Sequence, residues 1–207
     1  MEVKSGTTIV AIKFKDGVIL ASDKRTSAGF IIFNKQAEKL HQITDTIIMG
    51  AAGLVGDINY VVKLLKANAK LKELSSKNRV YAKELANLLG LLFNQYKYFP
   101  FLTEVIIAGK DENDYYIYTI DEAGGISKFK DYTSTGSGML YALGVLEAEY
   151  KENMDLSEAK ELAKKAVKAA IERDMGSGDG IEIWVLTDKG LEKEVYTIEK
   201  MAKKNIN

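Results

Sequence analysis

The sequence predicts an α+β protein in which two mainly antiparallel sheets pack face to face and helix pairs cover their outer faces. Along the 207 residues, strand-like and helix-like patterns follow in the order strands, two helices, strands, two helices, strands. Turn signals such as Asp16-Gly17 join neighbouring strand patterns, which is typical of antiparallel hairpins. The strict alternation of strand and helix that indicates a doubly wound parallel sheet is missing. Length and pattern favour one domain with a large core.

The first half is expected to hold three strands followed by two helices. Strand patterns cover residues 8–14, 18–21 and 46–52, and Asp57 is expected to cap the helix after the third strand. Two sets of apolar residues at helical spacing predict the helices, which end before Pro100. The sets are Ile58, Val61, Val62, Leu65 and Ala69, then Leu85, Leu88, Leu89, Leu92 and Phe93.

The second half predicts two strand pairs on either side of a second helix pair. A glycine-rich segment at 134–138 opens this helix pair, and another at 173–180 terminates it. The strands are expected at 103–108, 115–120, 181–186 and about 194–198, and the helices at 140–150 and from about residue 157.

Composition excludes several kinds of site. Lys and Arg number 29, as do Asp and Glu, so net charge gives no reason to expect nucleic acid or a membrane as a partner. The chain has no cysteine and one histidine, His41, which excludes cysteine and multi-histidine metal sites, and no metal or cofactor is expected. Residues 1–6 lack a secretory signal pattern and no run reaches the ~20 apolar residues of a membrane span, so the expected location is the cytoplasm.

The most informative local feature is the junction between Gly6 and Thr7, just ahead of the first strand pattern. Cleavage of this bond would give Thr7 both a hydroxyl and a free α-amine. Such an amine titrates near pH 7.7–8.0, so part of it is available as a base at neutral pH. An N-terminal threonine therefore carries a nucleophile and its activating base on one residue. We expect residues 1–6 to be a removable leader and residues 7–207 to form a single domain.

Asp23, Lys39 and Gly53 fit around this threonine. The first hairpin brings the end of its second strand, at Asp23, close to Thr7. A cation at Lys39 would favour a deprotonated hydroxyl, and Asp23 would keep that lysine charged and oriented. Gly53 follows a strand, where a backbone N–H can face a reacting carbonyl as an oxyanion-hole donor. Each residue taken alone also fits a plain role, as a solvated charge or a turn glycine.

The two glycine-rich segments allow two interpretations. Neither matches a phosphate-binding loop, because the first lacks a Lys-Ser ending and the second follows a helix. As structural features, Ser137 would cap a helix N-terminus and Gly176 a helix C-terminus. As functional features, Ser137, Asp174 and Ser177 would hold the amine of Thr7.

Motifs in a specific order separate these interpretations. They are Gly6-Thr7-Thr8, Asp16-Gly17, Ala21-Ser22-Asp23, Lys39, residues 52–57, residues 135–138, residues 141–147 and residues 173–179. Each is weak alone, whereas the ordered set is specific. Together they resemble the β subunits of archaeal-type proteasomes, over essentially the whole chain from Thr7 to about Ile198.

The resemblance implies the N-terminal-nucleophile hydrolase fold, a four-layer αββα sandwich, and a threonine endopeptidase. When the family's roles are carried over to the matching motifs, Thr7 is the nucleophile. Autocatalytic cleavage after Gly6 frees the α-amine of Thr7, which is the base. The other implied catalytic residues are Asp23, Lys39, Gly53, Ser137, Asp174 and Ser177. The implied substrate pocket is lined by Thr26, Ala37, His41, Ala51 and Val55, with Ala51 as its floor.

The resemblance also implies partners and leaves alternatives. The partners are proteasome α subunits and further β subunits in stacked seven-membered rings, a regulatory ring ATPase, and unfolded polypeptides as substrates. One alternative is the related bacterial proteasome-like protease, although residues 173–179 resemble the proteasome more. Another is a structural β-type subunit that keeps its leader, because an acylated Thr7 nitrogen cannot act as the base.

Overall fold

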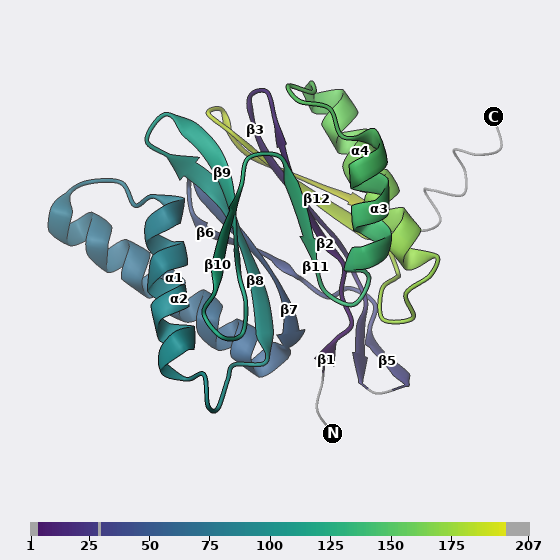
Figure 1. Cartoon of the computed structure of the whole chain (residues 1–207), viewed down its shortest axis with the longest axis horizontal. Helices are drawn as coiled ribbons and strands as arrows, with labels where there is room; N and C mark the ends of the chain where they lie inside the picture. The colour runs from purple at the N-terminus through teal and green to yellow at the C-terminus, as the bar shows by residue number, and fades with distance from the viewer. Residues whose placement is uncertain (1–3, 29, 198–207) are drawn as a thin grey trace.

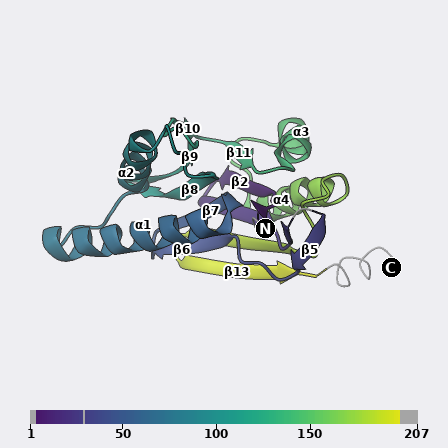
Figure 2. The ribbon, with the colours of Figure 1, turned by 90° about the horizontal axis from the view of Figure 1, so that it is seen from below.

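The protein folds as four layers, in which two sheets pack against each other and a pair of helices covers the outer face of each sheet. The computed structural model describes residues 4–28 and 30–197. Figure 1 shows α1 (Val55–Ser76) and α2 (Ala82–Gln95) outside one sheet, with α3 (Met139–Glu149) and α4 (Leu156–Ile171) outside the other. Figure 2 shows the same layers from below. The predicted αββα sandwich and its order of elements are confirmed.

The first sheet packs against α1 and α2 and contains eight antiparallel strands. Its order is β10-β9-β8-β7-β1-β4-β5, with β6 also paired to β7. The strands are β1 (Lys4–Ser5), β4 (Thr26–Ala28), β5 (Ile31–Asn34), β6 (Leu40–Thr44), β7 (Ile47–Leu54), β8 (Thr103–Asp111), β9 (Asp114–Ile120) and β10 (Ile126–Phe129).

The second sheet packs against α3 and α4 and has the order β11-β2-β3-β12-β13. Its strands are β2 (Ile9–Phe14), β3 (Gly17–Asp23), β11 (Tyr132–Thr135), β12 (Ile181–Thr187) and β13 (Gly190–Tyr196). The predicted first hairpin is present, with Phe14 opposite Gly17 across a two-residue turn. Its register sets the ends of β2 and β3 side by side.

Three apolar clusters hold the layers together. One lies between α1–α2 and the first sheet, one between α3–α4 and the second sheet, and one between the two sheets. Strands β2 and β3 supply residues to both faces of their sheet, as Val10 packs toward the helices and Ile9 toward the other sheet. Each such fully buried aliphatic side chain contributes about 1.5–3 kcal/mol, so the start of β2 is held rigidly.

Several local expectations were wrong. Asp57 does not cap α1, whose N-cap residue is Leu54, and its carboxylate instead accepts the N–H of Leu102 at 2.8 Å. Ser137 is not the cap of α3, because Gly138 takes that position, and α4 ends at Ile171, well before Gly176. Strands β1, β4, β5, β6, β10 and β11 were not predicted, since two to five residues carry too little periodicity.

Candidate active site

Thr7 lies two residues before the start of β2 and is fully buried. Its backbone N–H donates to Ser137 Oγ at 3.1 Å, and its carbonyl accepts the N–H of Gly138 at 3.3 Å. The nitrogen is a peptide nitrogen in this unprocessed chain and stands where an α-amine would lie after cleavage at Gly6–Thr7. The helix-opening segment after β11, the strand beside β2 in the same sheet, therefore contacts this residue.

Asp23, at the end of β3, is the charged centre beside Thr7. Its Oδ1 accepts the N–H of Thr8 at 2.9 Å and Lys39 Nζ at 2.8 Å. Its Oδ2 accepts the backbone N–H groups of Arg25 and Gly178 at 3.0 and 2.9 Å. The carboxylate is fully buried, and its hydrogen bonds compensate the cost of burying a charge.

Lys39 precedes β6 and is 3% exposed. Its Nζ bridges Asp23 Oδ1 and the carbonyl oxygen of Gly6, each at 2.8 Å. Burial lowers the pKa of Lys39, and the charge of Asp23 opposes that shift. Burial likewise raises the pKa of Asp23, which the lysine and the backbone donors oppose. A buried ammonium group thus contacts the carbonyl of the predicted cleavage site.

A second polar cluster joins the two glycine-rich segments. Asp174 Oδ2 accepts the hydroxyls of Ser137 at 2.7 Å and Ser177 at 2.6 Å. Ser177 Oγ also shares a hydrogen bond of 2.7 Å with Thr8 Oγ1. The three predicted residues are therefore brought together, next to the backbone nitrogen of Thr7.

Gly53 is the second-to-last residue of β7, and its φ of 132° is a backbone conformation that residues with a side chain rarely adopt. A Cβ at this position would lie 2.1 Å from the carbonyl oxygen of Leu102. Strand β7 continues through Gly53 rather than ending before it, and Ser5 of β1 lies opposite Gly53. The residues of β1 thus occupy the edge of β7 beside this glycine.

The five predicted pocket residues also come together. Thr26, Ala37, His41, Ala51 and Val55 line one pocket of about 180 Å³. It is also lined by residues absent from the prediction, namely Phe33, Asn34, Glu38, Lys39, Ile58 and Asn59. Within the described part of the chain, Nε2 of His41 has no hydrogen-bond partner. Burial, and then the charge of Lys66, lower the pKa of His41, so its ring is neutral at pH 7.

Sequence reasoning missed Arg25. Its Nε donates to Asp179 at 2.8 Å and its Nη1 to the carbonyl of Met175 at 3.2 Å, which fixes the segment that carries Asp174 and Ser177. The same segment supplies the Gly178 N–H to Asp23. No local pattern could reveal this clamp, because Arg25 and Asp179 are 154 residues apart.

The four-layer sandwich, with a threonine at the head of β2 beside a buried Lys–Asp pair, is the fold of the N-terminal-nucleophile hydrolases. The proteasome subunit family model matches residues 3–186, and the chain belongs to the proteasome subunit family. Similar proteins include the "Proteasome subunit beta" of Nanoarchaeum equitans, 45% identical over 94% of this chain and 100% of the relative.

Two more relatives carry the same description. The protein of Methanocaldococcus vulcanius is 43% identical, over 92% of this chain and 86% of the relative. The protein of Archaeoglobus fulgidus is 40% identical, over 90% of this chain and 88% of the relative.

The described residues contain no helix long and apolar enough to cross a membrane.

Proposed function

We propose that the chain is the precursor of a threonine endopeptidase subunit of the proteasome core particle, with Thr7 as the nucleophile. The observation that carries this proposal is the contact of Lys39 Nζ with the carbonyl oxygen of Gly6. An ammonium group at that oxygen stabilises the negative charge that develops when a nucleophile attacks the carbonyl carbon.

Maturation is the first reaction of this site. The Thr7 hydroxyl oxygen bonds to the Gly6 carbonyl carbon, the peptide C–N bond breaks, and the hydroxyl proton ends on the released amine. Water then hydrolyses the ester and frees residues 1–6. Pairing of Lys4 with Ser27 and Leu54, and of Ser5 with Gly53, orients the carbonyl for attack.

In the mature enzyme the α-amine of Thr7 takes the hydroxyl proton as a polypeptide substrate is attacked. The hydroxyl of Ser137, oriented by Asp174, holds that amine, and Lys39 favours the deprotonated oxygen of Thr7. Departure of the leader exposes the edge of β7, where the Gly53 N–H serves as the oxyanion donor.

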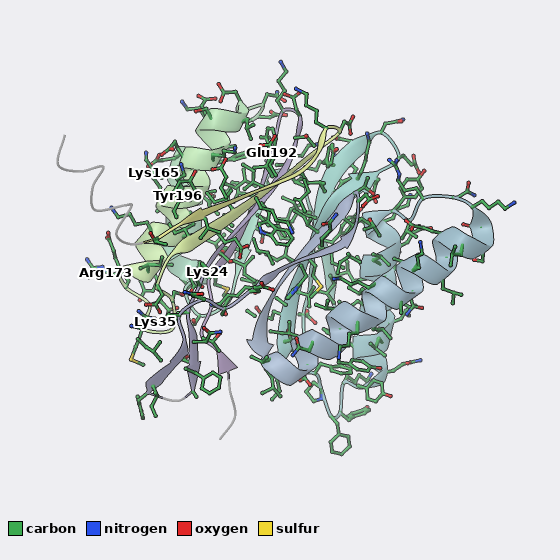
Figure 3. All side chains as sticks on the ribbon, turned by 180° about the vertical axis from the view of Figure 1, so that it is seen from behind. Lys24, Lys35, Lys165, Arg173, Glu192 and Tyr196 are labelled. Atoms are coloured by element: carbon green, nitrogen blue, oxygen red, sulfur yellow. The ribbon has the colours of Figure 1, made fainter. Side chains whose placement is uncertain are left out.

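The subunit acts within a cytoplasmic particle of stacked seven-membered rings, with α subunits and further β subunits. A regulatory ring ATPase feeds it unfolded polypeptides. Its surface supports such assembly, because large apolar side chains such as Phe30, Leu91 and Leu140 are 96%, 68% and 72% exposed. Figure 3 shows the β4–β5 hairpin projecting below Lys35.

Specificity gives the direct test of this function. We expect particles assembled with an α subunit to cleave mainly after leucine, tyrosine or phenylalanine, because Ala37, Ala51 and Val55 offer an apolar pocket. Since the pKa of His41 is lowered, a gain for acidic residues should appear only well below pH 6.5. Fluorogenic peptides that differ only at the residue before the cut measure both effects.

The control for this panel is the isolated chain, which should be an inactive precursor. A preference for glutamate or arginine over leucine at pH 7.5 would show that the pocket is wrongly assigned. Full activity of a dilute monomer would contradict the requirement for assembly.

The clamp made by Arg25 gives a second prediction. Hydrogen bonds to charged groups contribute about 1.5–3 kcal/mol, so Arg25→Met should loosen the segment with Asp174 and Ser177 and lower kcat about ten- to hundredfold, with little change in KM. Steady-state kinetics on assembled particles measure the effect. Arg173→Met is the matched control, since Arg173 is exposed at the surface (Figure 3). An equal loss in both variants would remove Arg25 from this role.

A further inference from the structure

Thr8, the residue after the proposed nucleophile, is fully buried and joins the two polar clusters of the site. Its backbone binds Asp23, since its N–H donates to Oδ1 at 2.9 Å and its carbonyl accepts the N–H of Asp23 at 3.3 Å. Its hydroxyl faces the other cluster, where Thr8 Oγ1 lies 2.7 Å from Ser177 Oγ. None of the reaction steps above uses this hydroxyl.

The hydrogen bonds at Ser177 can run in one direction. An ionised carboxylate only accepts hydrogen bonds, and a serine hydroxyl has one hydrogen to donate. Ser177 donates that hydrogen to Asp174 Oδ2 at 2.6 Å. At the contact between the two hydroxyls Ser177 therefore accepts the hydrogen bond, and Thr8 donates it.

Ser137 forms a matching arm on the other side of Asp174. Its hydroxyl donates to the same Oδ2 atom at 2.7 Å, and its Oγ accepts the N–H of Thr7 at 3.1 Å. Two consecutive residues thus reach one carboxylate oxygen through two serines, Thr7 by its backbone nitrogen and Thr8 by its side chain. The peptide unit between Thr7 and Thr8 closes these hydrogen bonds into a ring.

This ring gains importance when the leader is removed. Cleavage takes away the covalent bond to Gly6, which until then restrains the nitrogen that must act as the base. The arm through Ser177 then holds Asp174 in place relative to the backbone at the start of β2. The Thr8 hydroxyl is itself closely packed, because a Cβ at Gly138 would lie 2.0 Å from its Oγ1.

We propose that Thr8 is a positioning residue of the peptidase, whose hydroxyl orients Asp174 through Ser177 and thereby places the freed amine of Thr7 beside its own hydroxyl. This inference rests on the proposed peptidase function. Thr8 takes no part in bond making, so the loss of its hydroxyl should slow the catalytic step and leave substrate binding nearly unchanged.

A comparison of Thr8→Ser with Thr8→Ala isolates the hydroxyl, because both variants lack the methyl group and only serine keeps the donor. On particles assembled with an α subunit, Thr8→Ser should retain activity toward a leucine fluorogenic peptide. Thr8→Ala should lower kcat about two- to tenfold, the range for loss of one hydrogen bond, with little change in KM. Rates are counted per processed subunit, with processing measured by intact mass.

Thr133→Ala is the matched control for these variants. Thr133 is a buried threonine of β11, in the same sheet, and its hydroxyl takes no part in the ring. A general loss of packing in this sheet would lower kcat in this variant as well.

The pH profile separates positioning from a structural effect. The acidic limb of kcat/KM reports protonation of the Thr7 amine, because an ammonium group cannot act as the base. In Thr8→Ala the donor to Asp174 is weakened, so more of that negative charge acts on the amine and favours its ammonium form. The limb should move to higher pH in Thr8→Ala and stay in place in Thr133→Ala. The other charged groups at the site are the same in both variants: Asp23, Lys39 and Arg25.

A double-mutant cycle tests the route through Ser177. In Ser177→Ala the acceptor of the Thr8 hydroxyl is gone, so the additional change Thr8→Ala should lower kcat no further. A full additional two- to tenfold loss, about the same as in the wild-type background, would overturn this route.

The outcomes separate this inference from the proposed function. A loss in Thr8→Ala that Thr8→Ser does not share, together with the shifted acidic limb, supports the role of the hydroxyl. Equal kcat values and equal pH profiles of Thr8→Ser and Thr8→Ala overturn that role and leave the peptidase function in place. Wild-type particles that do not cleave the peptide refute both.

Discussion

Thr7→Ala should abolish peptidase activity and leave residues 1–6 attached in assembled particles. The variant lacks the hydroxyl that attacks the Gly6 carbonyl, so neither maturation nor substrate cleavage has a nucleophile. By comparison with loss of the nucleophile in serine peptidases, activity should fall on the order of 10⁶-fold. Intact-mass measurement of the subunit, together with peptide hydrolysis, checks both effects.

Thr7→Ser is the matched control for this variant. Serine keeps a hydroxyl, and after cleavage an α-amine, on the same residue, so it should still be processed and retain activity. The fold should be unchanged in both, because the backbone bonds of residue 7 to Ser137 and Gly138 do not involve its side chain. Removal of the leader in Thr7→Ala, with no other active subunit present, would refute autocatalysis.

Lys39→Ala should lower peptidase activity by orders of magnitude. The change removes the cation that contacts the Gly6 carbonyl and would ease proton loss from the Thr7 hydroxyl. Loss of one electrostatic stabiliser of this kind corresponds to roughly 3–4 kcal/mol in the activation free energy. Single-turnover kinetics and the rate of leader removal should both show it.

The fold should survive Lys39→Ala at reduced stability. Asp23 loses its cation but keeps the backbone donors of Thr8, Arg25 and Gly178. Lys39→Arg should not restore activity, because a wide planar guanidinium does not replace a compact ammonium in a buried site. Lys35→Ala, at an exposed neighbouring position, is the control. Near-normal turnover in Lys39→Ala would remove the lysine from the mechanism.

The sequence by itself determined the fold class and the first hairpin, whose second strand ends at Asp23 near the start of β2. Both follow from local patterns, since the order of strand and helix periods sets the layers and a two-residue turn sets the register of β2 and β3. The resemblance of the ordered motifs to a known family, and not local sequence patterns, predicted which distant residues would lie together in the site. That Ser137, Asp174 and Ser177 meet at Thr7 could not be derived from spacing.

Only the tertiary structure decided the contacts that make the site specific. Strand β1 lies between β7 and β4, Lys39 Nζ binds the Gly6 carbonyl, Arg25 binds Asp179, and Glu38 is among the residues that line the pocket. These contacts join segments far apart in the chain, and none leaves a period or a turn signal. They arise because packing of the layers fixes where strand ends and loops meet, which no local sequence preference encodes.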